Sequence, residues 1–184
     1  AGSTWEEDEK LCVNYINTEA TDGEKFIIAP HNIKPAAILE LKKSIHKKTL
    51  LYSEFKQAQF DGNLKDYQVF IIDTIGILTK IYAAADIAYV GGGLKTGLHN
   101  ILEPATFGIP VLIGNQYDKF KEAEDLVKIG GCISVKNQQE FTENFKTLKE
   151  DGSFRELTGV INKKYIEHRV GATKLVMDYL KTQL

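Results

Sequence analysis

The sequence is poor in cysteine and proline and has no long hydrophobic run. Its two cysteines, Cys12 and Cys132, lie far apart without Cys-x-x-Cys or His-x-x-x-His spacing. Neither a disulfide framework nor a metal site is therefore expected, and a reducing cytosolic environment is favoured. No apolar stretch approaches the roughly 18 residues that a membrane span needs, and no signal peptide precedes the first helix. The chain as given is expected to be soluble.

An excess of charge of one sign is also lacking. The net charge is −2, acidic and basic residues are interspersed, and the basic residues form no stripe with interleaved aromatics. Nucleic acid is therefore not expected as a partner. A hydrophobic fraction of 43% can bury a full core, which favours a single domain over residues 1–184 or one half of a two-domain enzyme. The start at Ala1, followed by the acidic run 6–9, is typical of an excised domain.

Apolar segments of strand length alternate with segments of helical periodicity along the chain. Strands are predicted at residues 25–29, 49–52, 67–72, 86–90, 109–114 and 132–135. Helices are predicted after Ser3 or Thr4, after Pro35, at 77–85, after Asn100, at 120–129 and 138–149, and in two C-terminal segments of the same domain from about 150 to 184. The alternation predicts an α/β fold, a Rossmann-like parallel sheet with helices on both faces.

The stretch around which we expect a site begins at the buried strand 86–90. The three glycines Gly91–Gly93 remove every side chain where the chain turns over the end of that strand. Pro104 lacks an N–H and fits only in the first turn of the next helix, so that helix begins between about Asn100 and Glu103.

The glycine loop and the start of this helix face one point. Free N–H groups and the positive end of the helix dipole make such a point an anion site. Lys95 and Thr96 can add a charge and a hydroxyl. We therefore predict a phosphate cradle.

Other small or polar residues follow predicted strands. His31 can contact a ligand or cap the next helix, and the sequence leaves both open. Thr74 and Gly76 can present backbone to a nucleotide base, although Asp73 and Thr74 as helix caps explain the pattern equally. Ser3 is interpreted as part of a ligand loop or, preferably, of a helix cap. The strand that precedes this segment would lie before residue 1. Ligands bind beyond the carboxyl ends of such strands, so these loops should converge on one crevice.

Glu103 is hard to reconcile with phosphate binding alone, because its carboxylate would repel the anion. One explanation is structural, since Asn100-x-x-Glu103 resembles a capping box. The other is a ligand with vicinal hydroxyls, because a carboxylate can accept two hydrogen bonds from a ribose. A phosphate loop with a ribose carboxylate indicates a nucleotide. His99 is read either as a loop histidine satisfied by backbone or as a contact to an anionic group of the ligand.

These motifs resemble a known family. The run from Ala84 to Gly93, followed by His99-Asn100-Ile101-Leu102-Glu103-Pro104-Ala105, looks like the carboxyl-terminal half of the Kdo transferases, which attach 3-deoxy-D-manno-octulosonic acid (Kdo) to the lipid A precursor. The segments 1–5, 73–76 and 115–121 fit the same family in the same order, so the resemblance spans nearly the whole chain. His-Asn-x-x-Glu-Pro-Ala after a Gly-Gly strand end is fairly specific.

The resemblance implies the donor-binding half of a GT-B glycosyltransferase that uses CMP-Kdo, with no metal or other cofactor. Glu103 would hold the ribose, the glycine loop and the helix start at Asn100 the phosphate, and residues 74–76 the cytosine. The candidate donor-binding residues are Ser3, His31, Thr74, Gly76, Gly91, Gly92, Gly93, Lys95, Thr96, His99, Asn100 and Glu103.

The resemblance also implies an absent amino-terminal half that binds the lipid A precursor and supplies the catalytic base. No catalytic residue is then expected in these 184 residues, which alone should be inactive. The full-length enzyme would associate with the cytoplasmic side of the bacterial inner membrane.

Two features differ from the commoner family form. The loop before His99 is shorter and lacks an arginine, and Pro30-His31-Asn32 stands in place of Pro-Arg-His. Lys95 and His31 are the candidate replacements.

Other functions fit the same pattern of residues. One is another GT-B enzyme or a nucleotide-sugar epimerase with a UDP-linked substrate, and another is a non-catalytic module that binds sugar nucleotides. A dinucleotide-binding dehydrogenase domain is disfavoured, because the glycines follow a late strand and no acidic residue lies at the required distance.

Overall fold

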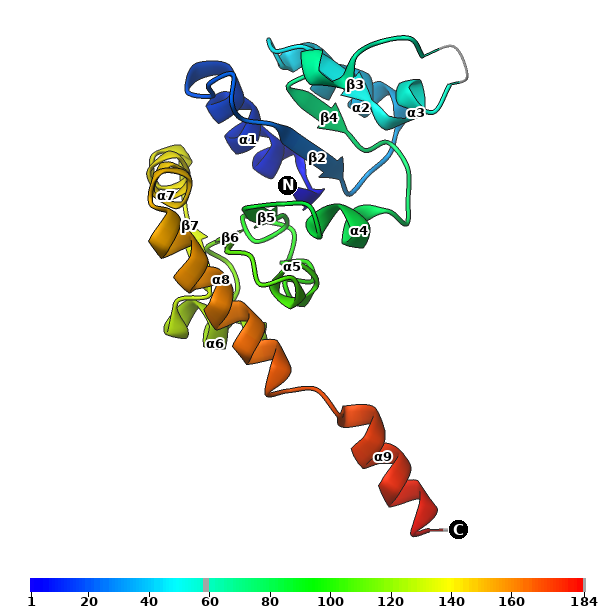
Figure 1. Cartoon of the computed structure of the whole chain (residues 1–184), viewed down its shortest axis with the longest axis vertical. Helices are drawn as coiled ribbons and strands as arrows, with labels where there is room; N and C mark the ends of the chain where they lie inside the picture. Colours follow the sequence, from blue (N-terminus) through cyan, green and yellow to red (C-terminus); the bar gives the residue numbers. More distant parts are fainter. Residues whose placement is uncertain (58–59, 184) are drawn as a thin grey trace.

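A computed structural model describes residues 1–57 and 60–183. Its centre is a seven-stranded sheet of order β3-β4-β2-β1-β5-β6-β7, in which neighbouring strands run parallel (Figure 1). The strands are β1 (Gly2–Thr4), β2 (Phe26–Pro30), β3 (Thr49–Leu51), β4 (Val69–Ile71), β5 (Ala88–Val90), β6 (Val111–Gly114) and β7 (Cys132–Val135). The predicted parallel α/β fold is confirmed.

Helices connect these strands. They are α1 (Glu6–Thr18), α2 (Pro35–Ser44), α3 (Tyr52–Phe55), the 3-10 helix η1 (Leu64–Asp66), α4 (Leu78–Tyr82), α5 (Leu102–Thr106), α6 (Lys121–Ile129), α7 (Gln138–Glu150), α8 (Gly152–Glu167) and α9 (Ala172–Lys181). Six of the predicted strands are present within a few residues of their expected bounds, and β1 is the strand that was not predicted.

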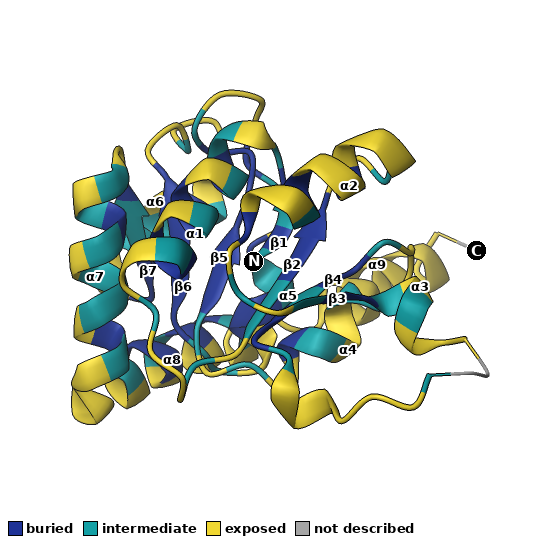
Figure 2. Ribbon diagram, turned by 90° about the horizontal axis from the view of Figure 1, so that it is seen from above, coloured by how far each residue is buried: buried dark blue, intermediate teal, exposed yellow. Residues whose placement is uncertain are grey.

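Helices cover both faces of the sheet because successive strand residues point to opposite faces. In β5, Tyr89 packs into a core with residues of α1, α2 and α7. Its neighbours Ala88 and Val90 pack into a second core with residues of α4, α5, α6 and α8. Figure 2 shows the strands as the buried centre of the molecule and the exposed residues on the outer sides of the helices. Burial on both faces explains why the strands are continuous apolar runs.

Strand β1 corrects the prediction for the first residues. The sequence indicated a loop and a helix cap at Ser3 or Thr4, but Gly2–Thr4 is a central strand and Trp5 occupies the cap position of α1. A Cβ on Gly2 would lie 1.9 Å from the hydroxyl of Tyr82 in α4. Because α4 packs so closely, position 2 must be glycine. Glycine has a low strand propensity, so the apolar pattern that identifies a strand is absent here.

The order of the strands reverses between β1 and β5. From β1 the chain runs to β2, β3 and β4 on one side, and it then returns to β5, β6 and β7 on the other. Such a switch point leaves a crevice beyond the carboxyl ends of the two central strands. Trp5 follows β1 at this position, and the glycine loop follows β5.

Two helices end or begin with residues that suit those positions. The Asn137 side chain accepts the N–H of Glu140 at 2.9 Å at the start of α7. Gly130, with φ of 84°, ends α6 in the left-handed conformation that favours glycine.

The predicted caps of α4 are wrong. This helix begins at Leu78, beyond the reach of Asp73 and Thr74, and it has no side-chain cap. The Asp73 carboxylate instead accepts the N–H of Ser53 at 2.9 Å and also the Ser53 hydroxyl. It therefore joins the end of β4 to α3.

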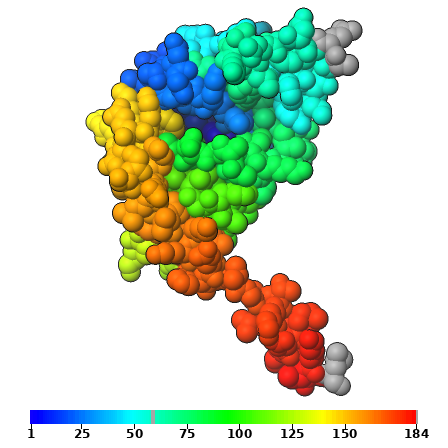
Figure 3. All heavy atoms as spheres, in the orientation of Figure 1, coloured from blue at the N-terminus to red at the C-terminus, as the bar shows by residue number. Residues whose placement is uncertain are grey.

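The two predicted C-terminal helices are present as α8 and α9. Helix α8 packs against α5, α6 and α7, whereas α9 projects away from the body of the molecule (Figures 1 and 3). Among residues 1–57 and 60–183 there is no helix with the length and apolar character that crossing a membrane requires.

Asn162 anchors α8 to the sheet. Its side chain is fully buried, and its Nδ2 donates to the carbonyl oxygens of Ile109 at 2.7 Å and Gly131 at 2.8 Å. These residues lie just before β6 and β7. One buried amide group therefore satisfies two backbone carbonyls where α8 meets the sheet.

We expect Asn162→Ala to lower the free energy of unfolding by about 2 to 4 kcal/mol, because two buried carbonyls lose their partner. Urea denaturation measures the change. Asn144→Ala is the control, since its Nδ2 donates to one carbonyl on a partly exposed helix face. A loss for Asn162→Ala no larger than that of the control would contradict the assignment.

Candidate functional site

The glycine loop after β5 is packed against the protein itself. Gly91, Gly92 and Gly93 are buried. A Cβ on Gly91 would lie 2.4 Å from the carbonyl oxygen of Ser3, and a Cβ on Gly92 would lie 2.1 Å from the carbonyl oxygen of Gly97. Close packing of β1 and of the loop on itself therefore accounts for both glycines.

The N–H groups of this loop are largely used within the fold. Gly91 donates to the carbonyl of Gly2 at 2.9 Å, and Gly92 donates to the carboxylate of Asp8 at 2.9 Å. The prediction that the glycines leave free N–H groups is wrong for these two residues. Helix α5 also has only five residues, so its dipole is small. Binding of an anion here must depend mainly on side chains.

Asp8 is a fully buried carboxylate beneath the loop. It accepts the N–H of Trp5 at 2.9 Å, the N–H of Gly92 at 2.9 Å and the hydroxyl of Tyr89 at 2.6 Å. Burial and the neighbouring Asp8 charge raise the pKa of Tyr89, so its hydroxyl remains a hydrogen-bond donor. One carboxylate thus joins α1, β5 and the glycine loop.

Three aromatic rings meet at the carboxyl ends of β1, β2 and β5. The ring of His31 lies 4.5 Å from the ring of Trp5 and 4.5 Å from the ring of His99, measured between centroids. Trp5 and His99 lie edge to edge, with an interplanar angle of 11° and a distance of 3.0 Å between Trp5 Nε1 and His99 Nε2. Burial and the nearby His31 lower the pKa of His99. The predicted site residues His31 and His99 are therefore in contact.

Glu103 is half-buried and is held by two side chains. Its carboxylate accepts the hydroxyl of Thr79 in α4 at 3.1 Å and the side-chain amide of Asn100 at 3.2 Å. The Asn100 side chain also accepts the N–H of Leu102, the first residue of α5, at 3.1 Å. The predicted alternative of a capping box is not formed, because the hydrogen bonds found for Glu103 come from side chains. A carboxylate can accept about four hydrogen bonds, so acceptor positions remain for hydroxyls of a ligand.

Lys95 and Thr96 are exposed on the loop between Gly93 and His99. The Lys95 ammonium forms an ion pair with the Glu7 carboxylate at 2.9 Å, and the Lys95 side chain is 72% exposed. Exposed pairs contribute at most about 1 kcal/mol, so Lys95 can exchange this partner for an anionic ligand at little cost.

The remaining predicted site residues lie in β1 and after β4, two strands that β2 separates in the sheet. Ser3 forms an irregularity in the pairing of β1 with β2 and has a positive φ of 52°, a conformation seen at bulges beside functional sites. Thr74 and Gly76 are exposed after β4, and Gly76 has a φ of 89°. No hydrogen bond joins Thr74 or Gly76 to the other predicted site residues within the part of the chain that the structure describes.

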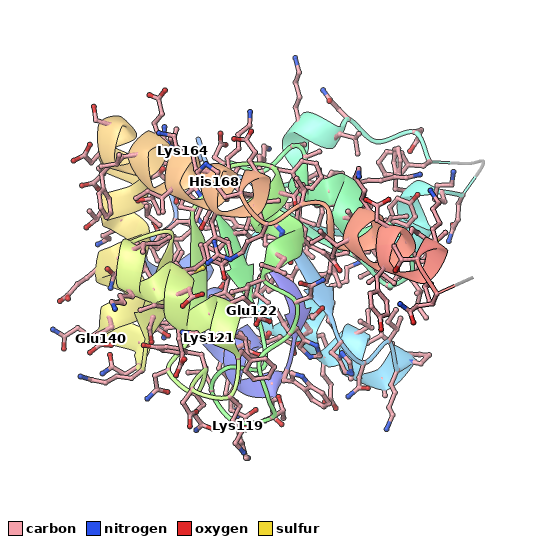
Figure 4. All side chains as sticks on the ribbon, turned by 90° about the horizontal axis from the view of Figure 1, so that it is seen from below. Lys119, Lys121, Glu122, Glu140, Lys164 and His168 are labelled. Carbon is pink, nitrogen blue, oxygen red and sulfur yellow. The ribbon has the colours of Figure 1, made fainter. Side chains whose placement is uncertain are left out.

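Two other features lie apart from the crevice. Lys164 and His168 are exposed on α8 and at its end (Figure 4). A cavity of about 590 Å³ opens beside Ala1, Phe26 and Asp86, at the amino ends of the strands. It corresponds to the recess at the centre of Figure 3. Parallel α/β sheets bind their ligands at the opposite ends, so we place the site in the crevice.

Comparison with known proteins identifies relatives of the chain. No family model matches it. The 3-deoxy-D-manno-octulosonic acid transferase of Aquifex aeolicus is 34% identical over 152 residues, which are 78% of this chain and 40% of that protein. The chain is a relative of the 3-deoxy-D-manno-octulosonic acid transferases. The enzyme of the same name from Chlamydia trachomatis (serovar A) is 25% identical over 186 residues, covering 100% of this chain and 42% of that protein. The chain thus spans about two fifths of the length of these transferases.

A solved structure has the same fold. The C-terminal CMP-Kdo binding domain of WaaA from Acinetobacter baumannii matches with a TM-score of 0.75 and 21% identity, over 90% of this chain and 86% of that chain. The Rossmann-like architecture predicted from the sequence is confirmed. The resemblance to the Kdo transferases is confirmed by the curated relatives.

Among residues 1–57 and 60–183, no group of three or more His, Cys, Asp or Glu has the arrangement that holds a metal ion. Cys12 and Cys132 are both free and buried.

The sequence analysis missed Trp5, Asp8 and Thr79. For Asp8 a signal existed, because it lies four residues before Cys12 and seven before Tyr15 and so shares the buried face of α1. An acid on an apolar face requires buried partners. Trp5 and Thr79 belong to no periodic pattern, and only the fold brings them to His99 and Glu103.

We expect Asp8→Ala to lower the free energy of unfolding by at least about 3 kcal/mol, because three hydrogen-bond donors lose a charged acceptor. Tyr89→Phe removes only one of the three and should cost about 1 to 2 kcal/mol. Urea denaturation measures both changes. Glu6→Ala, on the exposed side of α1, is the control and should have little effect. Equal effects of Asp8→Ala and Glu6→Ala would refute the central role of Asp8.

Proposed function

We propose that this chain is the donor-binding half of a glycosyltransferase that transfers Kdo from CMP-Kdo. The proposal is supported by the relatives named above and by the position of the crevice at the switch point between β1 and β5. The share of the relatives that the chain spans agrees with one half of a two-domain GT-B enzyme.

The observation that supports the proposal most strongly is the set of hydrogen bonds made by the Glu103 carboxylate. Its carboxylate is held from the side by Thr79 and Asn100 and makes no capping box with its own helix. Such a group suits a neutral diol, because a carboxylate accepts strong hydrogen bonds from two vicinal hydroxyls. We therefore assign the ribose of CMP to Glu103.

The phosphate of CMP is assigned to Lys95 and His99, which lie on the segment between β5 and α5. Gly93 and Thr96 complete this part of the site, and Thr74 and Gly76 are assigned to the cytosine. During transfer, a hydroxyl of the acceptor attacks the anomeric carbon of Kdo while the bond from that carbon to the phosphate oxygen breaks. Lys95 stabilises the charge that develops on the departing CMP. No step requires a metal ion.

The acceptor and the catalytic base are assigned to a half that these 184 residues do not contain. In this proposal that half binds the lipid A precursor, receives the proton of the acceptor hydroxyl and contacts the cytoplasmic side of the inner membrane. The 184 residues alone then bind the nucleotide sugar without turnover.

We expect Glu103→Gln to weaken binding of CMP by roughly 30-fold, or about 2 kcal/mol, because hydrogen bonds to a charged acceptor are lost. Isothermal titration calorimetry measures the affinity. The parent chain should discriminate CMP from 2′,3′-dideoxycytidine monophosphate, and Glu103→Gln should remove that discrimination. Glu156→Gln on the exposed face of α8 serves as the control. Discrimination that survives in Glu103→Gln would refute the ribose assignment.

We further expect CMP to bind at least about tenfold more tightly than UMP or AMP. A site that pairs with the amino group of cytosine leaves buried polar groups unpaired when uracil or adenine enters. Titration of the three nucleotides against the purified chain ranks them. A preference for UMP would favour a UDP-sugar enzyme instead.

A further inference from the structure

Trp5, His31 and His99 come from three different strand ends, and their contacts define a single arrangement. The indole of Trp5 has one polar hydrogen, on Nε1, and it can only donate. At 3.0 Å, His99 Nε2 must therefore be the acceptor. A nitrogen that accepts carries no proton, so the proton of the neutral imidazole lies on Nδ1.

The surroundings of His99 also oppose a second proton. An imidazolium would direct an N–H at Nε2 against the N–H of Trp5. Burial and the stacked His31 both lower the pKa of His99. Asp8, the other titratable group that acts on this ring, raises the pKa less than these two effects lower it. His99 is therefore neutral near pH 7.

The partners of His99 are themselves held by the fold. The backbone N–H of Trp5 is bound by Asp8, which is fully buried. The backbone N–H of His99 donates to the carbonyl of Gly91 at 3.1 Å. His31 lies across both rings and restricts their rotation. Among the residues that the structure describes, no hydrogen bond from His99 Nδ1 is found, so this N–H is available to a ligand.

We propose that Trp5 is a positioning residue that keeps His99 neutral with its proton on Nδ1, so that His99 offers one fixed N–H to the phosphate of the bound nucleotide. The part that concerns the phosphate rests on the proposed function. The part that concerns Trp5 and His99 rests on the geometry of the free chain. His99 then recognises the phosphate as a neutral hydrogen-bond donor, and Lys95 supplies the charge.

The first test is an NMR measurement on the free 184-residue chain. A long-range proton–nitrogen correlation spectrum reports which ring nitrogen of each histidine carries the proton. We expect His99 to be the Nδ1–H form, with its pKa lowered from the ordinary value of a histidine; His46 and His168 at the end of α8 (Figure 4) are exposed histidines in the same spectrum. Protonation of Nε2 in the parent chain would overturn the proposal without any variant.

Trp5→Phe keeps a ring for stacking on His31 and deletes only the indole N–H. We expect the Nε2–H form of His99 to become populated and its titration midpoint to rise. His46 and His168 are internal controls in the same spectrum and should not change. An unchanged tautomer and midpoint of His99 in a folded Trp5→Phe chain would refute the role of Trp5.

The second test measures binding of CMP and of cytidine to the parent and to Trp5→Phe from pH 8 to pH 6. At pH 8 we expect CMP to bind Trp5→Phe about fivefold more weakly, because an oriented hydrogen bond is lost. Cytidine, which lacks the phosphate, should bind both proteins equally. On acidification the variant should regain affinity relative to the parent, because its His99 gains a proton and attracts the phosphate as a cation.

The outcomes separate the two parts of the proposal. Titration of the phosphate itself affects both proteins equally and cancels in the ratio of their affinities. An equal loss of CMP and cytidine binding would indicate a merely structural role for Trp5 and would refute the phosphate contact. If the parent chain does not bind CMP, the proposed function and the phosphate contact both fail. The NMR experiment then still decides whether Trp5 sets the tautomer of His99.

Discussion

The buried carboxylate of Asp8 is the constraint on which the site depends. A charged group without access to water is tolerated only when it is fully hydrogen-bonded, and here its partners come from α1, β5 and the loop after β5. These segments flank the switch point of the sheet. Their relative positions cannot change without leaving a charge unpaired. The crevice is therefore rigid at its centre, where ligands of such sheets bind.

This constraint changes the role of the glycines. In the sequence, Gly91–Gly93 indicate a loop that approaches a ligand. In the structure, Gly91 makes room for the backbone of β1, and the N–H of Gly92 satisfies Asp8. The loop is thus a packed support, and in the proposed function its side chains contact the ligand. His99 and Asn100 are adjacent residues, and they connect the ring stack with the group around Glu103.

Much of the fold follows from local pattern. The apolar runs at β5 and β6 are buried at every position, and those at β2 and β4 are buried or half-buried, so their hydrophobicity alone identifies them. Pro104 lies in the first turn of α5 as predicted, and Asn137 caps α7; both residues act through local backbone chemistry. Strand β1 was missed because it begins with Gly2, a residue that rarely occurs in strands. Only glycine fits there, because a Cβ would clash with Tyr82, which lies 80 positions away in sequence. The role of Asp73 was mistaken for the same reason, since Ser53 reaches it from another element.

The sequence by itself determined the alternation of strands and helices and the family resemblance, and it predicted the segment 91–103 as the centre of the site. These features depend on periodicity and on motifs of neighbouring residues. The tertiary structure alone decided that Glu103 is held by Thr79, that Trp5 donates to His99, and that Gly92 donates to Asp8. Each of these contacts joins residues brought together by the order of strands in the sheet. The local sequence pattern does not determine the order of the strands, because that order results from packing helices on both faces of the sheet at once.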